Sequence, residues 1–211
     1  MDPAPRSSRT SLRIAVVVII AAVTAGAIWL IERPTPVAPG ILFVGDSVTY
    51  LSTSALDDEM RSDDPQVVAR IGFRSSEMLP LFEREVLRRK QMGDEHLQQV
   101  AILIGYNDVL QDKVGEADID RFMDAAERFE CAVWLELPPV PMHDDDVAVW
   151  NRQVATAARS HPNVHVIDDW RNAVMRAKPG ELITRKDGVH PTKAGAARLA
   201  QIYTDGVHRV C

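Results

Sequence analysis

Ile41-Leu42-Phe43-Val44-Gly45-Asp46-Ser47-Val48 is an apolar run that ends in a glycine, an acid and a serine. A short, continuous apolar run bounded by turn-forming residues is typical of a buried parallel strand. The pattern predicts a strand at residues 41–44. It places Ser47 directly after that strand, in the turn that leads into the next helix.

Similar apolar runs, rich in β-branched residues, recur at residues 67–71, 100–104, 132–137 and 164–167. Helical periodicity separates them. The residues that recur on helical faces are Leu79, Phe82 and Val86; Val147, Trp150, Val154 and Ala157; and Leu199, Ile202 and Tyr203, in a last helix opened by Pro191 and Thr192. This alternation predicts an α/β fold, namely a flavodoxin-like three-layer α/β/α domain with a five-stranded parallel sheet.

The N-terminal part carries a candidate membrane anchor. Residues 14–31 form a run of 18 residues without charge. As a helix it would span roughly 27 Å, close to the roughly 30 Å hydrocarbon core of a bilayer. Arginines at positions 6, 9 and 13 precede the run. By the positive-inside rule, residues 1–13 are then cytoplasmic and residues 32–211 extracytoplasmic.

We therefore predict one transmembrane signal anchor at residues 14–31, a Pro-rich linker at 32–40 and one domain at 41–211, at the cell membrane. The alternative is a cleaved signal peptide, because Ala25-Gly26-Ala27 has the form of a cleavage site, and the domain would then be secreted. The apolar stretch Ile28-Trp29-Leu30-Ile31 continues past that site and favours the anchor.

The net charge of the chain argues against one class of function, the binding of nucleic acid. The net charge is −6, and it becomes −8 without residues 1–31. A basic surface for nucleic acid is therefore not expected.

Cys131 and Cys211 both lie in the exported part, where a disulfide is permitted. The alternative, a buried thiol and a loose terminal one, stays open. Arginine far outnumbers lysine, which hints at a GC-rich bacterial genome.

Several chemistry-bearing residues share one edge of the predicted sheet. Ligands of open parallel sheets bind beyond the carboxyl ends of the strands. Ser47, Gly72 and Asn107 follow the first three predicted strands. Asp187 and His190 lie in the loop before the last helix. The topology thus predicts that all five residues meet at this edge.

Their chemistry suits acyl transfer to a serine. Ser47 would attack an acyl carbonyl, His190 would take and later return the proton, and Asp187 would orient the imidazole. The oxyanion would need fixed donors. The candidates for this oxyanion hole are the backbone N–H groups of Ser47 and Gly72 and the side-chain amide of Asn107.

With these motifs in order, residues 41–205 resemble the SGNH hydrolases, also called GDSL-type esterases and lipases. The matching residues are Ser47 in Gly45-Asp46-Ser47-Val48, Gly72, Asn107 in Gly105-Tyr106-Asn107-Asp108, and Asp187 with His190 in Asp187-Gly188-Val189-His190-Pro191. A valine replaces the family's usual leucine after the serine. The resemblance implies a serine hydrolase of carboxylic esters that needs no metal and no cofactor. Family members also include carbohydrate deacetylases, thioesterases and acyltransferases.

Alternatives to this interpretation remain. An O-acyltransferase could use the same triad, and a non-catalytic envelope module could retain the fold to bind a glycan. With the domain outside the membrane, the candidate substrates are acylated glycans, peptidoglycan or lipids of the cell envelope.

Two further stretches have plainer interpretations. The acids at 144–146 are expected to begin a helix rather than to hold a metal. The second Asp-Gly-Val-His, at residues 205–208, predicts a helix stop at Gly206 and a surface His208.

Overall fold

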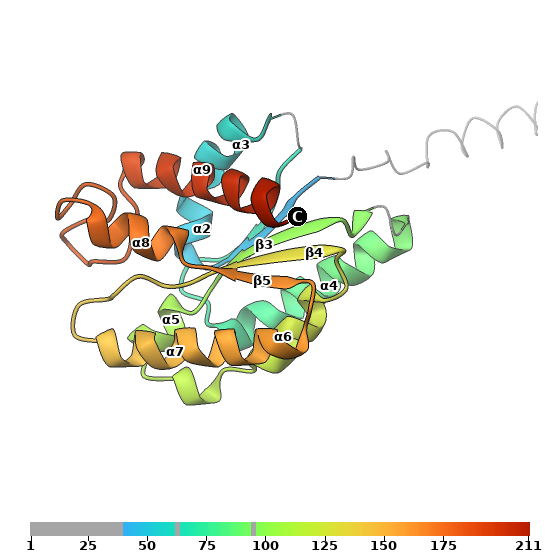
Figure 1. The fold of residues 1–211 in the computed structure, drawn as a ribbon, viewed down its shortest axis with the longest axis horizontal. Helices are drawn as coiled ribbons and strands as arrows, with labels where there is room; N and C mark the ends of the chain where they lie inside the picture. The colour runs from blue at the N-terminus through green and yellow to red at the C-terminus, as the bar shows by residue number, and fades with distance from the viewer. Residues whose placement is uncertain (1–39, 62–63, 94–95) are drawn as a thin grey trace, which may run out of the picture. The chain divides into compact units, whose positions relative to one another are not determined.

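The computed structural model describes residues 40–61, 64–93 and 96–211, all of which belong to one compact unit (Figure 1). The predicted cytoplasmic segment, the anchor at 14–31 and the linker up to residue 39 lie outside the described residues. Within the described part, no helix combines the length and the apolarity that a membrane crossing requires.

A five-stranded parallel sheet forms the centre of the domain, in the order β2-β1-β3-β4-β5. The strands are β1 (Leu42–Gly45), β2 (Gln66–Ala69), β3 (Gln99–Leu103), β4 (Cys131–Leu135) and β5 (Val164–Ile167). All five predicted strands are present, and four of them differ from prediction by one or two residues at each end. This order is the flavodoxin-like one, so the predicted fold is confirmed for the described residues.

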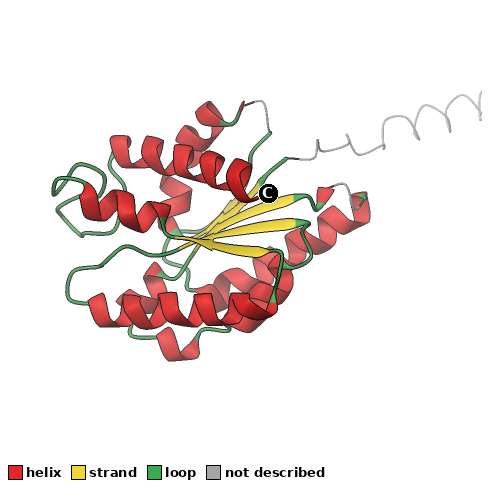
Figure 2. Ribbon diagram, in the orientation of Figure 1, coloured by secondary structure: helices red, strands yellow, loops and turns green. Residues whose placement is uncertain are grey.

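Helices cover both faces of the sheet. They are α2 (Ser47–Leu51), α3 (Thr53–Glu59), α4 (Ser75–Met92), α5 (Tyr106–Leu110), α6 (Ile119–Ala126), α7 (Asp144–Ala157), α8 (Asp169–Arg176) and α9 (Lys193–Val210), with short 3₁₀ turns at Val114–Glu116 and Ala158–Ser160. Figures 1 and 2 show α3, α8 and α9 over one face and α4, α6 and α7 over the other. The sheet therefore lies between two helical layers, which explains why its strands are apolar on both faces.

The centre of the sheet fixes where the candidate residues emerge. Gly45, the last residue of β1, pairs with Ala69 of β2 on one side and with Leu103 of β3 on the other. The side chains of Leu42, Phe43 and Val44 are fully buried. The loops after β2, β1 and β3 consequently leave the core at the same level, next to one another.

The last helix differs from prediction at its glycine. Thr192 caps α9 as predicted, because its hydroxyl accepts a hydrogen bond from Gly195 N at 3.0 Å. The predicted stop at Gly206 is wrong, since α9 continues to Val210. Gly206 is buried, and an added Cβ there would lie 2.7 Å from Ile167 Cδ1. This glycine therefore serves close helix–sheet packing, while His208 is exposed as predicted.

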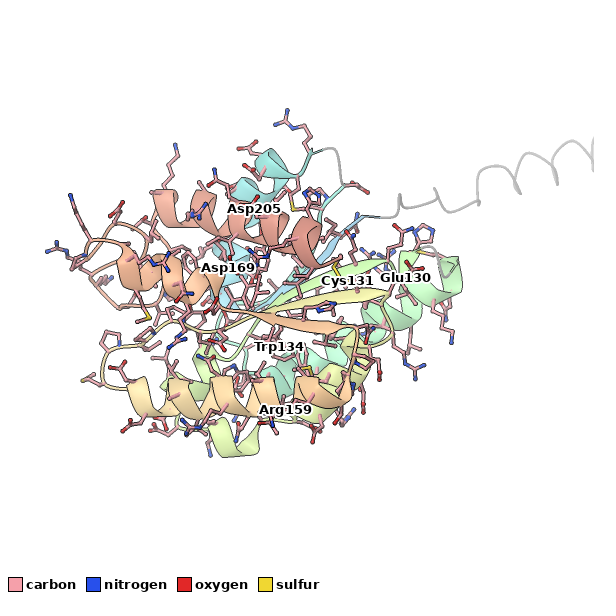
Figure 3. The ribbon with its side chains drawn as sticks, in the orientation of Figure 1. Glu130, Cys131, Trp134, Arg159, Asp169 and Asp205 are labelled. Atoms are coloured by element: carbon pink, nitrogen blue, oxygen red, sulfur yellow. A yellow bond between two sulfur atoms is a disulfide. The ribbon has the colours of Figure 1, made fainter. Side chains whose placement is uncertain are left out.

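The cysteine alternatives are resolved in favour of a disulfide. Cys131 and Cys211 are bonded, with their Cα atoms 5.7 Å apart. Cys131 is the first residue of β4 (labelled in Figure 3), so the bond ties the end of α9 to the amino edge of the sheet. The acids Asp144, Asp145 and Asp146 lie in the first turn of α7, as predicted.

Candidate active site

The serine lies at the start of the first helix after β1. Ser47 is the first residue of α2, and its side chain faces the loop before α9. Its Oγ is 3.0 Å from Nε2 of His190, a residue 143 positions away in the chain. The predicted meeting of these two side chains is present in the structure.

The histidine is held by a closed loop. Ile183 and Pro191 form an antiparallel bridge, and Thr184 N donates to the carbonyl of His190 at 2.9 Å. His190 Nδ1 is 3.1 Å from Oδ2 of Asp187. An ionised carboxylate only accepts hydrogen bonds, so Nδ1 carries the proton and the Nε2 lone pair faces Ser47.

Asp187 is kept ionised by its neighbours. Its Oδ1 accepts hydrogen bonds from the N–H groups of Val189 and His190, both at 2.9 Å, and from the Thr184 hydroxyl at 2.8 Å. Burial works against ionisation. The N–H groups of Val189 and His190, followed by the imidazole and the Thr184 hydroxyl, outweigh it and hold the pKa of Asp187 well below its usual range.

Gly72 lies in the loop after β2, and Asn107 lies in the first turn of α5, where the chain leaves β3 (residues 104–107, here called the Asn107 loop). Gly72 has a φ of +80°, and an added Cβ would meet no atom within 4 Å, so open space lies beside it. The Asn107 amide donates one hydrogen bond to the carbonyl of Phe73 at 3.0 Å. An amide nitrogen has two hydrogens, so one is left to donate to a ligand. The structure thus brings the predicted residues to one edge of the sheet.

Asp46 is a residue whose importance the sequence motifs did not reveal. Its buried carboxylate accepts hydrogen bonds from Val48 N at 3.1 Å and from Tyr106 N at 3.2 Å. It therefore connects the turn that carries Ser47 to the residue before Asn107. Burial raises the pKa of Asp46 to about 7, although the two N–H groups oppose the rise. The signal in the sequence is its place directly before Ser47.

Further contacts that sequence reasoning missed hold the Asn107 loop. The buried carboxylate of Asp108 accepts hydrogen bonds from Ser75 N at 2.9 Å and Ser75 Oγ at 2.7 Å. Gly105 has a φ of +121°, and the Trp150 ring packs where its side chain would be. Both contacts join residues more than 30 positions apart, so no local pattern announces them.

Two surface clusters of the described residues combine one histidine with two carboxylates. Their members are Asp112, His143 and Asp146, and Asp124, Glu127 and His161. The Asp112 and Asp124 side chains are 81% and 70% exposed, and ring nitrogens of His143 and His161 lie 3.8 and 4.0 Å from their carboxylates. Neither cluster includes a residue of the Ser47 site. That the site needs no metal and no cofactor stays a prediction.

Comparison with solved structures supports the same architecture. A GDSL-like lipase from Bacteroides thetaiotaomicron matches with a TM-score of 0.64 and 16% identity, over 89% of this chain and 96% of that one. A putative acylhydrolase from Bacteroides fragilis matches with a TM-score of 0.62 and 18% identity, over 84% and 91%. The chain has the fold of the GDSL-type hydrolases. The resemblance predicted from the motifs is therefore confirmed at the level of the fold.

The GDSL-type fold also occurs in an enzyme that transfers acyl groups. The C-terminal catalytic domain of peptidoglycan O-acetyltransferase A from Streptococcus pneumoniae matches with a TM-score of 0.55 and 16% identity, over 82% of this chain and 93% of that one. No family model matches the sequence, and no curated protein matches it significantly.

Proposed function

We propose that this protein is a serine hydrolase that cleaves carboxylic esters through an acyl-Ser47 intermediate. The observation that carries the proposal is the unbroken chain of hydrogen-bonding distances from Ser47 through His190 to Asp187, at 3.0 and 3.1 Å. A serine hydroxyl is a weak nucleophile until a positioned base accepts its proton. This arrangement supplies the base and the group that orients it.

The proposed reaction has two steps, acylation of Ser47 and hydrolysis of the acyl-enzyme. The Ser47 oxygen forms a bond to the ester carbon while its proton passes to His190 Nε2. The resulting oxyanion is stabilised by the N–H groups of Ser47 and Gly72 and the free amide hydrogen of Asn107. Collapse expels the alcohol, which takes the proton from His190. A water molecule then repeats the sequence and releases the carboxylic acid and free Ser47.

The exposure of the triad favours hydrolysis over transfer to another alcohol. The side chains of His190 and Asp187 are each 37% exposed, so water has access to the base. A transferase must keep water from the acyl-enzyme. The O-acetyltransferase fold neighbour keeps transfer as the second candidate. Product analysis with and without a polysaccharide acceptor separates the two, because only a transferase makes the acylated acceptor.

The proposed nucleophile is tested with a fluorophosphonate probe and with p-nitrophenyl acetate. We expect the wild-type protein to be labelled and to release nitrophenol, and Ser47→Ala to do neither. A Ser160→Ala variant, altered at an exposed serine away from the site, serves as the control and should be labelled. Unchanged labelling of Ser47→Ala would remove the nucleophile. Ligand binding without turnover would support the glycan-binding module instead.

We also propose that residues 14–31 anchor the domain on the outer side of the cell membrane. The uncharged run of 18 residues and the three preceding arginines support this arrangement. Alkaline carbonate extraction should leave the full-length protein in the membrane pellet, and deletion of residues 1–31 should release it. A mature protein whose N-terminus is Ile28 would show signal-peptide cleavage and refute the anchor.

A further inference from the structure

A groove of about 530 Å³ is lined by residues that follow Ser47 and His190 in the chain, so its two walls continue the segments that supply the catalytic pair. One wall is formed by α2 and α3, and the other by residues 191–193, 196 and 197 at the start of α9. Small-molecule sites in proteins usually measure roughly 300–1,000 Å³. The groove therefore has room for a substantial part of a substrate.

The first residues of both groove walls lie close in the chain to the catalytic pair. Leu51 lies one turn beyond Ser47 on α2, on the same helical face, and its side chain is 46% exposed. On the opposite wall, Pro191 directly follows His190. Both walls of the groove therefore begin within one helical turn of the catalytic pair along the chain.

The walls combine apolar side chains with charged ones, and the charged ones include Lys193 beside the acids. Leu51, Ala55 and Pro191 are among the apolar wall residues. Asp58 and Glu59, at the other end of α3, contribute exposed carboxylates. Carboxylates accept hydrogen bonds from hydroxyl groups, whereas the apolar residues suit a carbon–hydrogen surface. Such walls fit a ligand with one apolar face and several hydroxyls, as a sugar ring has.

Proton transfer decides which half of the ester enters the groove. The oxyanion donors Gly72 and Asn107 come from the loops after β2 and β3, so the carbonyl oxygen points toward those loops. His190 returns its proton to the oxygen of the departing alcohol, which must therefore lie on the His190 side. The groove extends from that side along α9.

We propose that this groove binds the alcohol portion of the ester and selects a hydroxylated alcohol of sugar type. The proposal rests on the proposed function, because it assigns the leaving group of that reaction. It makes Leu51, Ala197 and Glu59 determinants of alcohol specificity.

The test compares two acetyl esters, 6-O-acetylglucose and ethyl acetate, with purified full-length protein. The measured quantity is the ratio of their kcat/KM values. We expect Ala197→Trp, which fills the groove, to lower the sugar-to-ethyl ratio by about tenfold or more. Ala194→Trp is the matched control, because Ala194 is also exposed on α9 but does not line the groove. It should leave the ratio at its wild-type value.

A second pair of variants tests the polar end without adding bulk. Glu59→Gln should lower the same ratio, whereas Asp57→Asn, altered at an exposed acid of α3 outside the groove, should not. The ratio of ethyl butyrate to ethyl acetate is measured in parallel. If Ala197→Trp changes that ratio instead, the groove holds the acyl chain and the proposal is wrong.

A sugar-to-ethyl ratio that neither Ala197→Trp nor Glu59→Gln changes would also overturn the proposal. These outcomes differ from a failure of the proposed function. In that case the wild-type protein would hydrolyse none of the esters and the fluorophosphonate probe would not label Ser47.

Discussion

At the scale of single residues, the carboxylate of Asp187 determines how the imidazole is presented to Ser47. Asp187→Asn keeps the shape but can place an N–H donor against Nδ1, which favours the wrong tautomer of His190. We expect kcat/KM for p-nitrophenyl acetate to fall by about 10³-fold or more. Steady-state kinetics with matched circular dichroism spectra provide the measurement. Activity within tenfold of wild type would mean that Asp187 does not orient the base.

Asp46 should make folding stability depend on pH. In the folded protein burial raises its pKa to about 7, whereas an exposed aspartate ionises near pH 4. Between these values the folded state retains a proton that the unfolded chain has lost, so stability falls as pH rises from about 4 to about 7. The loss from this group amounts to about 4 kcal/mol at most.

Urea unfolding of wild type and Asp46→Asn at pH 4, 5.5 and 7 measures this slope. We expect the variant to show a flatter dependence. Some slope should remain, because burial also raises the pKa of Asp108. Asp187 acts in the opposite sense and only at lower pH, since its pKa lies below its usual range. Parallel curves for the two proteins would show that Asp46 ionises normally.

The residues of the site were predictable to different degrees. Ser47 and the Asp187–His190 pair could be inferred because their short motifs supply a nucleophile, an acid and a base, and the predicted topology brings both motifs to one edge of the sheet. Asp46 could not be assigned its connecting role, because its partner Tyr106 lies 60 residues away. Thr184 was missed for a different reason, since a threonine three residues before an aspartate is common and has no chemistry of its own.

At the scale of elements, Gly105 allows the helix α7 to approach the Asn107 loop. Its φ of +121° is strained for other residues, and the Trp150 ring occupies the place of a side chain. Gly105→Ala should therefore lower the free energy of unfolding by roughly 2–4 kcal/mol. It should also reduce esterase activity, because Asn107 moves with the loop.

Gly115→Ala is the matched control for this prediction. Gly115 has no atom within 4 Å of an added Cβ and no positive φ. We expect its free energy of unfolding to change by less than about 0.5 kcal/mol. Chemical denaturation of both variants makes the comparison, and equal stability of the two would show that Trp150 can move aside at little cost.

The strands were easier to predict than the helices. Apolar runs located all five strands, because a strand buried on both faces has few polar residues to blur its pattern. The short helix α5 could not be predicted, since five residues are too few to show helical periodicity. The helix stop predicted at Gly206 was wrong for a physical reason. A glycine suits both a helix end and a tight helix–sheet contact, and only the residue that packs against it decides between them.

At the scale of the whole molecule, the bond between Cys131 and Cys211 closes a loop across 80 positions of the chain. In the chain-entropy account a loop of this length stabilises the folded state by about 4 kcal/mol. The double variant Cys131→Ser/Cys211→Ser should lose about that amount in urea unfolding. Its kcat should remain near the wild-type value, because the bond lies at the amino edge of the sheet.

A reducing agent supplies the control for the disulfide. Dithiothreitol should destabilise the wild-type protein and leave the double variant unaffected. If reduction changes neither protein, the bond contributes nothing to stability. A large drop in kcat on reduction would instead show that the amino edge and the catalytic edge are coupled.

The placement of the two ends of the described domain, Gly40 and Cys211, has a practical consequence for handling it. Gly40 leads into the amino end of β1, and Cys211 is bonded to the first residue of β4, whereas Ser47 follows the carboxyl end of β1. Immobilisation of residues 40–211 on a resin through either end of this domain would therefore leave the Ser47 edge of the sheet turned toward the bulk solution.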